Sequence, residues 1–221
     1  EWELPPGFEV KNVEWPYPQR FNLGAMVGFG YLDTVWLLAE ISPPASAALN
    51  NEVEIGATVN WLVCSDETCL PGSSSLKTKL TIKDTPSQKL SQHAGNFEAA
   101  RSKLPGKQPI SALRKDGLIE LTWNSEHSLS FTEADFFPEH QDQIDHKVPP
   151  LLTPSLDDSG NLTIVLKEAE SNDAANLKGV LVLKSEGKDA VAIAVEAPLQ
   201  DDTSPVAYAD IKSNSGALEK R

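Results

Sequence analysis

The chain has 221 residues, of which 40% are hydrophobic and 23% are charged, and its formal net charge at pH 7 is −13. This composition is typical of a globular protein with one large or two ordinary domains. The negative charge argues against nucleic acids and anionic membrane surfaces as partners, because both require contacts from Lys and Arg. No apolar stretch approaches the ~20 residues of a membrane span. We therefore expect protein or small-molecule partners and no direct membrane insertion of this chain.

The first residues have neither the basic region nor the apolar region of a signal peptide, so the chain is expected to begin inside a larger protein. The first long strand is predicted over residues 31–41, between Gly30 and Pro43. The clearest strand pattern covers residues 53–63, where the odd positions are apolar and the even positions are mostly polar. This period of two predicts that the odd-numbered side chains face a core and that Cys64 lies on the opposite face.

A returning strand is predicted over residues 76–82, where apolar residues alternate with Lys and Thr. Cys64 and Cys69, the chain's two cysteines, flank the polar turn that precedes it. Such a turn can bring two Cα atoms within the ~4.4–6.8 Å that a disulfide requires. The closed loop of about six residues would restrict the unfolded chain less than a long-range disulfide would.

The spacing alone leaves two readings of this pair equally open, a redox-active disulfide and a stabilising disulfide in a secreted β-domain. A metal site is disfavoured, because two thiolates need further ligands from elsewhere. Copper handling is disfavoured for the same reason, since Met26 is the single methionine.

Residues 86–104 contain no β-branched residue and are followed by Pro105 and Gly106, a pattern that indicates a helix despite Gly95. A second β-rich region follows, with strands expected over residues 117–123, 128–132, 160–167, 177–184 and 190–196. Short strands at this spacing favour a second sandwich over a βαβ unit.

We therefore predict an all-β chain of two β-sandwich domains joined by a short helical linker. The predicted boundaries are residues 1–84 for the first domain, 85–108 for the linker, 109–200 for the second domain and 201–221 for a polar tail. Residues 139–146 gather two histidines and three carboxylates, but their spacing matches no zinc or calcium loop. This segment is expected to be a solvated loop, and no metal or other cofactor is predicted.

Four stretches together resemble the N-terminal periplasmic region of the DsbD family of thiol:disulfide interchange proteins, in the branch with a long, two-part N-terminal region. The most specific is the cysteine segment, with its Trp-Leu-Val-Cys entry at residues 61–64 and its Cys-Leu-Pro-Gly exit at residues 69–72. The others are Val-Glu-Trp-Pro-Tyr-Pro-Gln-Arg-Phe at residues 13–21, Val-Gly-Phe-Gly-Tyr at residues 27–31 and Phe-Phe-Pro-Glu at residues 136–139.

The resemblance implies that the two β-sandwich domains are immunoglobulin-like and that the first carries a redox-active disulfide between Cys64 and Cys69. This pair would take electrons from a membrane-embedded domain of the same or a partner chain and pass them to thioredoxin-like proteins. The resemblance also implies a periplasmic location, as part of an inner-membrane protein, and a role in electron transport and cytochrome c-type biogenesis. The family's first sheet begins some tens of residues before the segment that matches Glu1, so the first domain is expected to lack early strands.

In that family a loop covers the disulfide with an aromatic side chain. The matching positions here are Val27, Gly28, Phe29, Gly30 and Tyr31. Phe29 is the expected cap and Tyr31 is the second candidate. Either ring could instead be an ordinary core aromatic at the start of a strand.

Asp66 and Glu67 lie between the cysteines, and carboxylates near a thiol disfavour its thiolate form. They could equally be solvated turn residues. We expect a reduced pair that reacts slowly until a partner docks and moves the cap. The family resemblance implies that Cys69 forms the mixed disulfide with the partner and that Cys64 resolves it.

The alternative function is a non-enzymatic extracytoplasmic binding or scaffold module whose disulfide is purely structural. The reduction potential separates the two, because structural disulfides of secreted proteins have potentials below about −300 mV.

Overall fold

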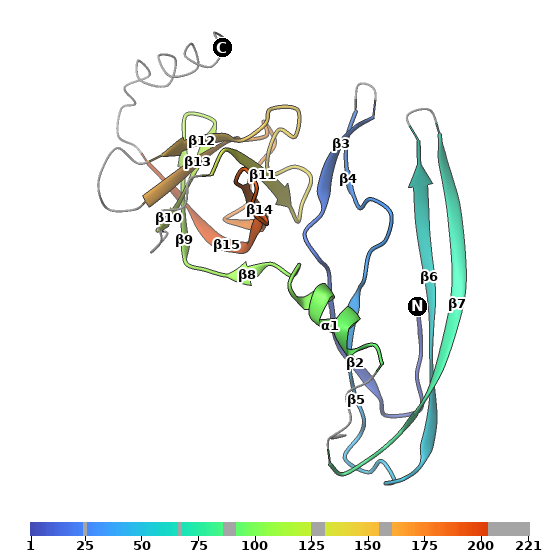
Figure 1. Cartoon of the computed structure of the whole chain (residues 1–221). Coiled ribbons are helices and arrows are strands. Elements are labelled where there is room, and N and C mark those ends of the chain that lie inside the picture. Colours follow the sequence, from blue (N-terminus) through green and yellow to red (C-terminus); the bar gives the residue numbers. More distant parts are fainter. Residues whose placement is uncertain (24–25, 66–67, 86–91, 125–130, 155–160, 203–221) are drawn as a thin grey trace. The chain divides into compact units, whose positions relative to one another are not determined.

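The computed structural model describes residues 1–23, 26–65, 68–85, 92–124, 131–154 and 161–202. The chain divides into two compact units, Glu1–Leu104 and Pro105–Arg221 (Figure 1). Both units are built of β-strands, and the described residues include one short helix, α1 (Ala94–Arg101). The all-β prediction is therefore confirmed.

The first unit contains three small antiparallel sheets (Figure 1). The largest has three strands, in the order β1 (Trp2–Glu3), β6 (Glu52–Cys64) and β7 (Cys69–Thr81). The other two are the pair of β2 (Glu9–Glu14) with β5 (Leu38–Ser42) and the pair of β3 (Gln19–Leu23) with β4 (Met26–Gly30).

The β6–β7 hairpin follows the predicted period of two, but most of its apolar face is not buried. Ile55 is 6% exposed, whereas Trp61 and Val63 are 44% and 62% exposed. The alternation determines which side chains share a face, and burial depends on what packs against that face. The core prediction is therefore correct near Ile55 and wrong toward the cysteine end. The short strand β1 pairs with β6 at Gly56 and Ala57, which lie close to Ile55.

The single strand predicted over residues 31–41 is also wrong. Strand β4 ends at Gly30, and β5 begins only at Leu38. Between them Asp33 has a φ of 57°. A residue in this left-handed region interrupts the extended backbone of a strand, so the chain turns here before it enters β5.

Helix α1 occupies the middle of the predicted helical segment, of which residues 86–91 lie outside the described part. Its last turn is closed by side chains. The Ser102 hydroxyl donates to the Ala99 carbonyl at 3.0 Å, and Arg101 forms an ion pair with Glu98 at 2.8 Å. After the helix, the Tyr17 N–H donates to the Lys103 carbonyl at 3.2 Å and so fastens this segment to the chain that enters β3.

The second unit contains one eight-stranded sheet, in the order β11-β14-β15-β9-β10-β13-β12, with β8 also paired to β15. The strands are β8 (Gly106–Lys107), β9 (Ile110–Lys115), β10 (Leu118–Asn124), β11 (Glu133–Pro138), β12 (Leu151–Pro154), β13 (Asn161–Lys167), β14 (Asn176–Lys184) and β15 (Val191–Asp201). Four of the five strands predicted here correspond to β10, β13, β14 and β15. The fifth, over residues 128–132, falls mostly outside the described residues, and β11 begins directly after it.

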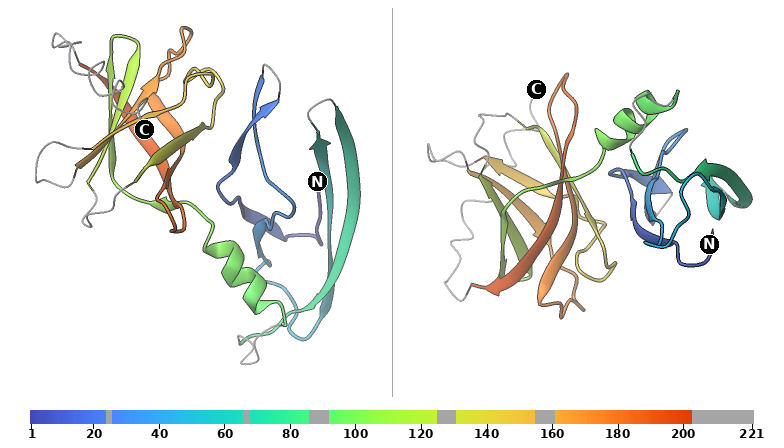
Figure 2. Two further views of the ribbon diagram at one scale, coloured as in Figure 1. Left: turned by 45° about the horizontal axis from the view of Figure 1, so that its top comes forward. Right: turned by 90° about the horizontal axis from the view of Figure 1, so that it is seen from below.

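Alternating apolar residues of these strands form the core of the second unit. Ile119 and Leu121 of β10 and Ile164 and Leu166 of β13 are at most 1% exposed. Figure 2 shows the sheet curling around this core. The strand predictions are closest to the structure here because the periodic side chains are buried, as the patterning argument assumes.

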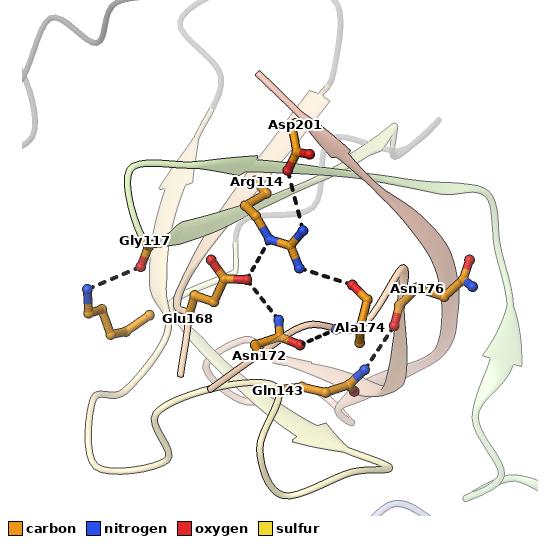
Figure 3. Close-up of polar contacts among 9 residues, drawn as sticks. Arg114, Gly117, Gln143, Glu168, Asn172, Ala174, Asn176 and Asp201 are labelled. Carbon is orange, nitrogen blue, oxygen red and sulfur yellow. Dashed lines mark hydrogen bonds and ion pairs between the residues drawn. The ribbon is translucent and has the colours of Figure 1, made fainter. Parts of the chain in front are cut away.

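A polar network fastens the loop after β13 to strand β9 (Figure 3). Arg114 Nε donates to Glu168 Oε1 at 2.6 Å, and Arg114 Nη2 donates to the Ala174 carbonyl at 3.0 Å. Asn172 Nδ2 donates to the same Glu168 oxygen at 2.8 Å. Burial disfavours the charged guanidinium, but the bonds to Glu168 and Asp201 outweigh it and raise the pKa of Arg114. Arg114 is therefore charged throughout the physiological pH range.

The prediction that segment 139–146 is a solvated loop is wrong in part. Gln143 and Ile144 are only 2% and 4% exposed. The Gln143 amide donates to the Asn176 carbonyl at 2.9 Å (Figure 3), and its Oε1 accepts from the Lys178 N–H at 3.4 Å. The segment therefore closes one end of β14. Within the described residues, no group of three or more His, Cys, Asp or Glu side chains is placed to hold a metal.

Replacing Glu168 with Ala should destabilise the second unit by about 2 kcal/mol, because the partly buried Arg114 guanidinium loses its charged partner. Urea unfolding of the whole chain, followed by circular dichroism, measures this loss. Glu170→Ala is the matched control, since Glu170 is an exposed residue of the same loop. Equal stability of the two variants would show that the network contributes nothing.

Candidate functional site

A disulfide joins the two strands of the longest hairpin at its tip. Cys64 ends β6, Cys69 begins β7, and the two residues are direct partners in the antiparallel register. The S–S distance is 2.02 Å and the Cα–Cα distance is 4.0 Å. The predicted pairing of the cysteines is therefore present in the structure.

A tight turn beyond the disulfide holds the two strands together. The Ser65 N–H donates to the Thr68 carbonyl at 2.8 Å, and the Thr68 N–H donates to Ser65 Oγ at 3.2 Å. The predicted modulating residues Asp66 and Glu67 lie outside the described residues. Because this turn and the strand register fix the backbone on both sides, the two sulfur atoms stay adjacent whether or not they are bonded.

Both cysteines are exposed, and they lie on the face opposite to that of Trp61 and Val63, as the alternation predicts. Two residues further from the tip, Leu62 shares their face and is 67% exposed. The disulfide is thus open to an incoming thiol, with an apolar side chain beside it.

A groove of about 500 Å³ connects the cysteine hairpin with the β3–β4 hairpin. Figures 1 and 2 both show the two hairpins side by side within the first unit. The groove is lined by Phe21, Asn22, Gly28, Phe29, Gly30, Tyr31 and Leu32 on one side and by Leu62, Cys64 and Ser65 on the other. Four of the five predicted cap residues therefore line the same groove as Cys64. Val27 and Cys69 are not among the lining residues.

Phe29 is a partly exposed aromatic residue on the wall of this groove, with 38% of its surface accessible. It belongs to strand β4 rather than to a loop. Arg20 is its direct partner on β3 and places its guanidinium 6.0 Å from the centre of the Phe29 ring. This separation is within the range of a cation–π interaction, which holds the ring from the side of β3.

Tyr31 follows β4 directly and is only half buried. Its hydroxyl donates to the Pro16 carbonyl at 2.8 Å, and its ring stacks on Trp15 with centroids 6.4 Å apart and an interplanar angle of 23°. Burial raises the pKa of Tyr31, so the hydroxyl remains a hydrogen-bond donor at neutral and mildly alkaline pH.

Sequence reasoning missed Leu62, Leu32 and Arg20 as parts of this site. Leu62 could have been found, since the period of two places it on the face of Cys64. Arg20 was missed because its position opposite Phe29 depends on the pairing of β3 with β4, which was not predicted. Leu32 was missed because it lies in the turn between β4 and β5, where a continuous strand was expected.

Residues 1–81 match the family model described as the N-terminal region of the thiol:disulfide interchange protein DsbD. The match ends at the last residue of β7, so it contains every strand of the first unit, both cysteines and the predicted cap. This segment is similar to the DsbD N-terminal family over somewhat more than a third of the chain. Comparisons with curated proteins and with solved structures gave no match.

The similarity suggests a thiol:disulfide interchange module, and the two cysteines of this segment are joined in the structure. Residues 136–139, which contributed to the resemblance, lie outside the matched range. Among the described residues, the chain forms no helix with the length and apolarity needed to cross a bilayer.

The disulfide should contribute modestly to the stability of the first unit. Its loop of six residues corresponds to about 2 kcal/mol in the chain-entropy account. Replacing both cysteines with Ser should therefore lower the free energy of unfolding by about that amount, measured by urea unfolding with tryptophan fluorescence. Reduced wild-type protein is the control and should behave like the variant. Unfolding of the first unit on reduction would contradict the expectation and assign the bond a structural role.

Proposed function

We propose that the chain is a thiol:disulfide oxidoreductase module that relays electrons through Cys64 and Cys69. In this proposal it accepts electrons from a membrane-embedded DsbD-type domain and passes them to thioredoxin-like proteins in the periplasm, including those of cytochrome c-type biogenesis. The observation that carries the proposal is an exposed disulfide at a hairpin tip, in a DsbD-type segment, beside a groove with an aromatic wall. A short hairpin lets the bond open and close with little rearrangement elsewhere.

The reaction is a pair of thiol–disulfide exchanges. The Cys69 thiolate attacks one sulfur of the partner's disulfide, forms a mixed disulfide with it and releases the other partner sulfur as a thiolate. The Cys64 thiolate then attacks Cys69 Sγ, which restores the Cys64–Cys69 bond and releases the partner as a dithiol. Two electrons and two protons pass to the partner in total. The same exchanges in reverse, with the membrane-embedded donor, reduce the Cys64–Cys69 disulfide again.

The position of the groove supports Cys69 as the first nucleophile. Cys64 lines the groove with Phe29, whereas Cys69 is exposed and lies outside the lining. A partner can therefore approach Cys69 without displacing the ring. We further propose that Phe29 restricts access to Cys64 until a partner docks, and that Asp66 and Glu67 disfavour the thiolate forms.

The reduction potential tests the relay against a purely structural disulfide. Equilibration of the whole chain with thioredoxin, followed by alkylation and gel shift, should give a potential above about −300 mV and complete exchange within the assay. The variant with both cysteines replaced by Ser is the control and should leave the thioredoxin redox state unchanged. A potential below about −300 mV, with no exchange, would favour the scaffold function instead.

The order of attack is tested with single-cysteine variants. The probe is a thioredoxin that retains only its nucleophilic cysteine, activated as a mixed disulfide with thionitrobenzoate. Cys64→Ala, which leaves Cys69, should form the protein–protein disulfide at least about tenfold faster than Cys69→Ala, because Cys69 lies outside the groove. Release of thionitrobenzoate measures both rates. Equal rates would contradict the assignment.

A further inference from the structure

The β3–β4 hairpin carries Phe29, yet it has few partners of its own. It forms a separate two-stranded sheet within the first unit. An isolated two-stranded hairpin is marginally stable in water. Gly28 and Gly30 flank Phe29 in β4 and make that strand more flexible. Contacts at the base of the hairpin therefore help, together with Arg20, to hold the Phe29 ring at the groove.

Tyr31 makes such a contact. It is the first residue after β4, and its hydroxyl donates to the carbonyl of Pro16, which lies just before β3. The hydrogen bond thus joins the chain that leaves the hairpin to the chain that enters it. Pro16 is buried, and the Tyr31 ring stacks on the neighbouring Trp15, so the accepting segment is itself fixed.

Tyr31 also stands between two hollows of the first unit. It lines the disulfide groove, and it lines a second hollow of about 330 Å³ together with Tyr17, Trp36 and part of helix α1. Its ring is therefore a wall between the groove and the base of the hairpin. Because its hydroxyl is already hydrogen-bonded to Pro16, Tyr31 is better placed to fix the base of the hairpin than to cover the disulfide.

We propose that Tyr31 is a positioning residue whose hydroxyl clasps the base of the β3–β4 hairpin and so holds Phe29 beside Cys64. The clasp limits access to Cys64 through the groove, and it acts on the disulfide only through Phe29. This inference rests on the proposed function, in which Phe29 limits access to a reactive disulfide.

The test is the rate at which iodoacetamide alkylates the Cys64 thiol of the whole chain with Cys69 replaced by Ala, because Cys69 itself lies outside the groove. The reduction potential is measured with both cysteines present. Tyr31→Phe removes only the hydroxyl and keeps the stacked ring. It should raise the rate about fivefold, the change in an opening equilibrium that the loss of one ordinary hydrogen bond produces. The reduction potential should stay unchanged, because the clasp governs access and not the energy of the bond. Tyr17→Phe is the matched control, since Tyr17 lines the second hollow but not the groove, and its rate should equal that of the chain with Cys69→Ala alone.

A double-mutant cycle tests whether Tyr31 acts through Phe29. Phe29→Ala alone should also raise the rate, and adding Tyr31→Phe should raise it no further. An unchanged rate in Tyr31→Phe, or full additivity of the two changes, would overturn the role of Tyr31 and leave the relay intact. A Phe29→Ala rate equal to that of the chain with Cys69→Ala alone would instead refute the cap. Failure of the wild-type disulfide to exchange with thioredoxin would refute the proposed function itself. Thermal unfolding of each variant, monitored by circular dichroism, establishes that it is folded.

Discussion

The antiparallel register of β6 and β7 is the constraint on which the site depends. Thirteen residues of each strand pair without a shift, from Glu52 opposite Thr81 to Cys64 opposite Cys69. A slip of one residue would move the cysteines out of opposition and turn one of them to the other face. Ion pairs near the open end of the hairpin, between Lys77 and Glu54 and between Lys79 and Glu52, join the two strands diagonally. The reactive pair is therefore placed by contacts along the whole length of the hairpin.

The sequence was most informative where a single periodic strand decides the outcome. The alternation from Val53 to Val63 placed Cys64 on the correct face, and the polar turn placed Cys69 opposite it. Alternation could not tell how deeply those side chains are buried, because burial requires a second layer. It also could not reveal the turn at Asp33, where one backbone angle ends a stretch of residues that all suit a strand.

Contacts between distant segments were beyond prediction from one sequence. Arg20 and Phe29 meet through the register of a hairpin, Tyr31 reaches Pro16 across its base, and Arg114 meets Glu168, which lies 54 positions further along the chain. Each is an ordinary polar or aromatic residue within its own stretch of sequence. Strands β10, β13, β14 and β15 of the second unit were predicted because its core buries the periodic side chains on which the patterns depend, whereas β8, β9 and β12 were not predicted.

Strand β15 of the second unit has a mechanical consequence. It runs parallel to β8 at Ile193 and Ala194 and parallel to β9 from Leu199 to Asp201. Tension applied between the start of β8 and the end of β15 would pull these neighbours in opposite directions along their length. Their hydrogen bonds would then be loaded together in shear rather than opened one at a time. The unit is thus built to transmit force from one of its ends to the other without unravelling.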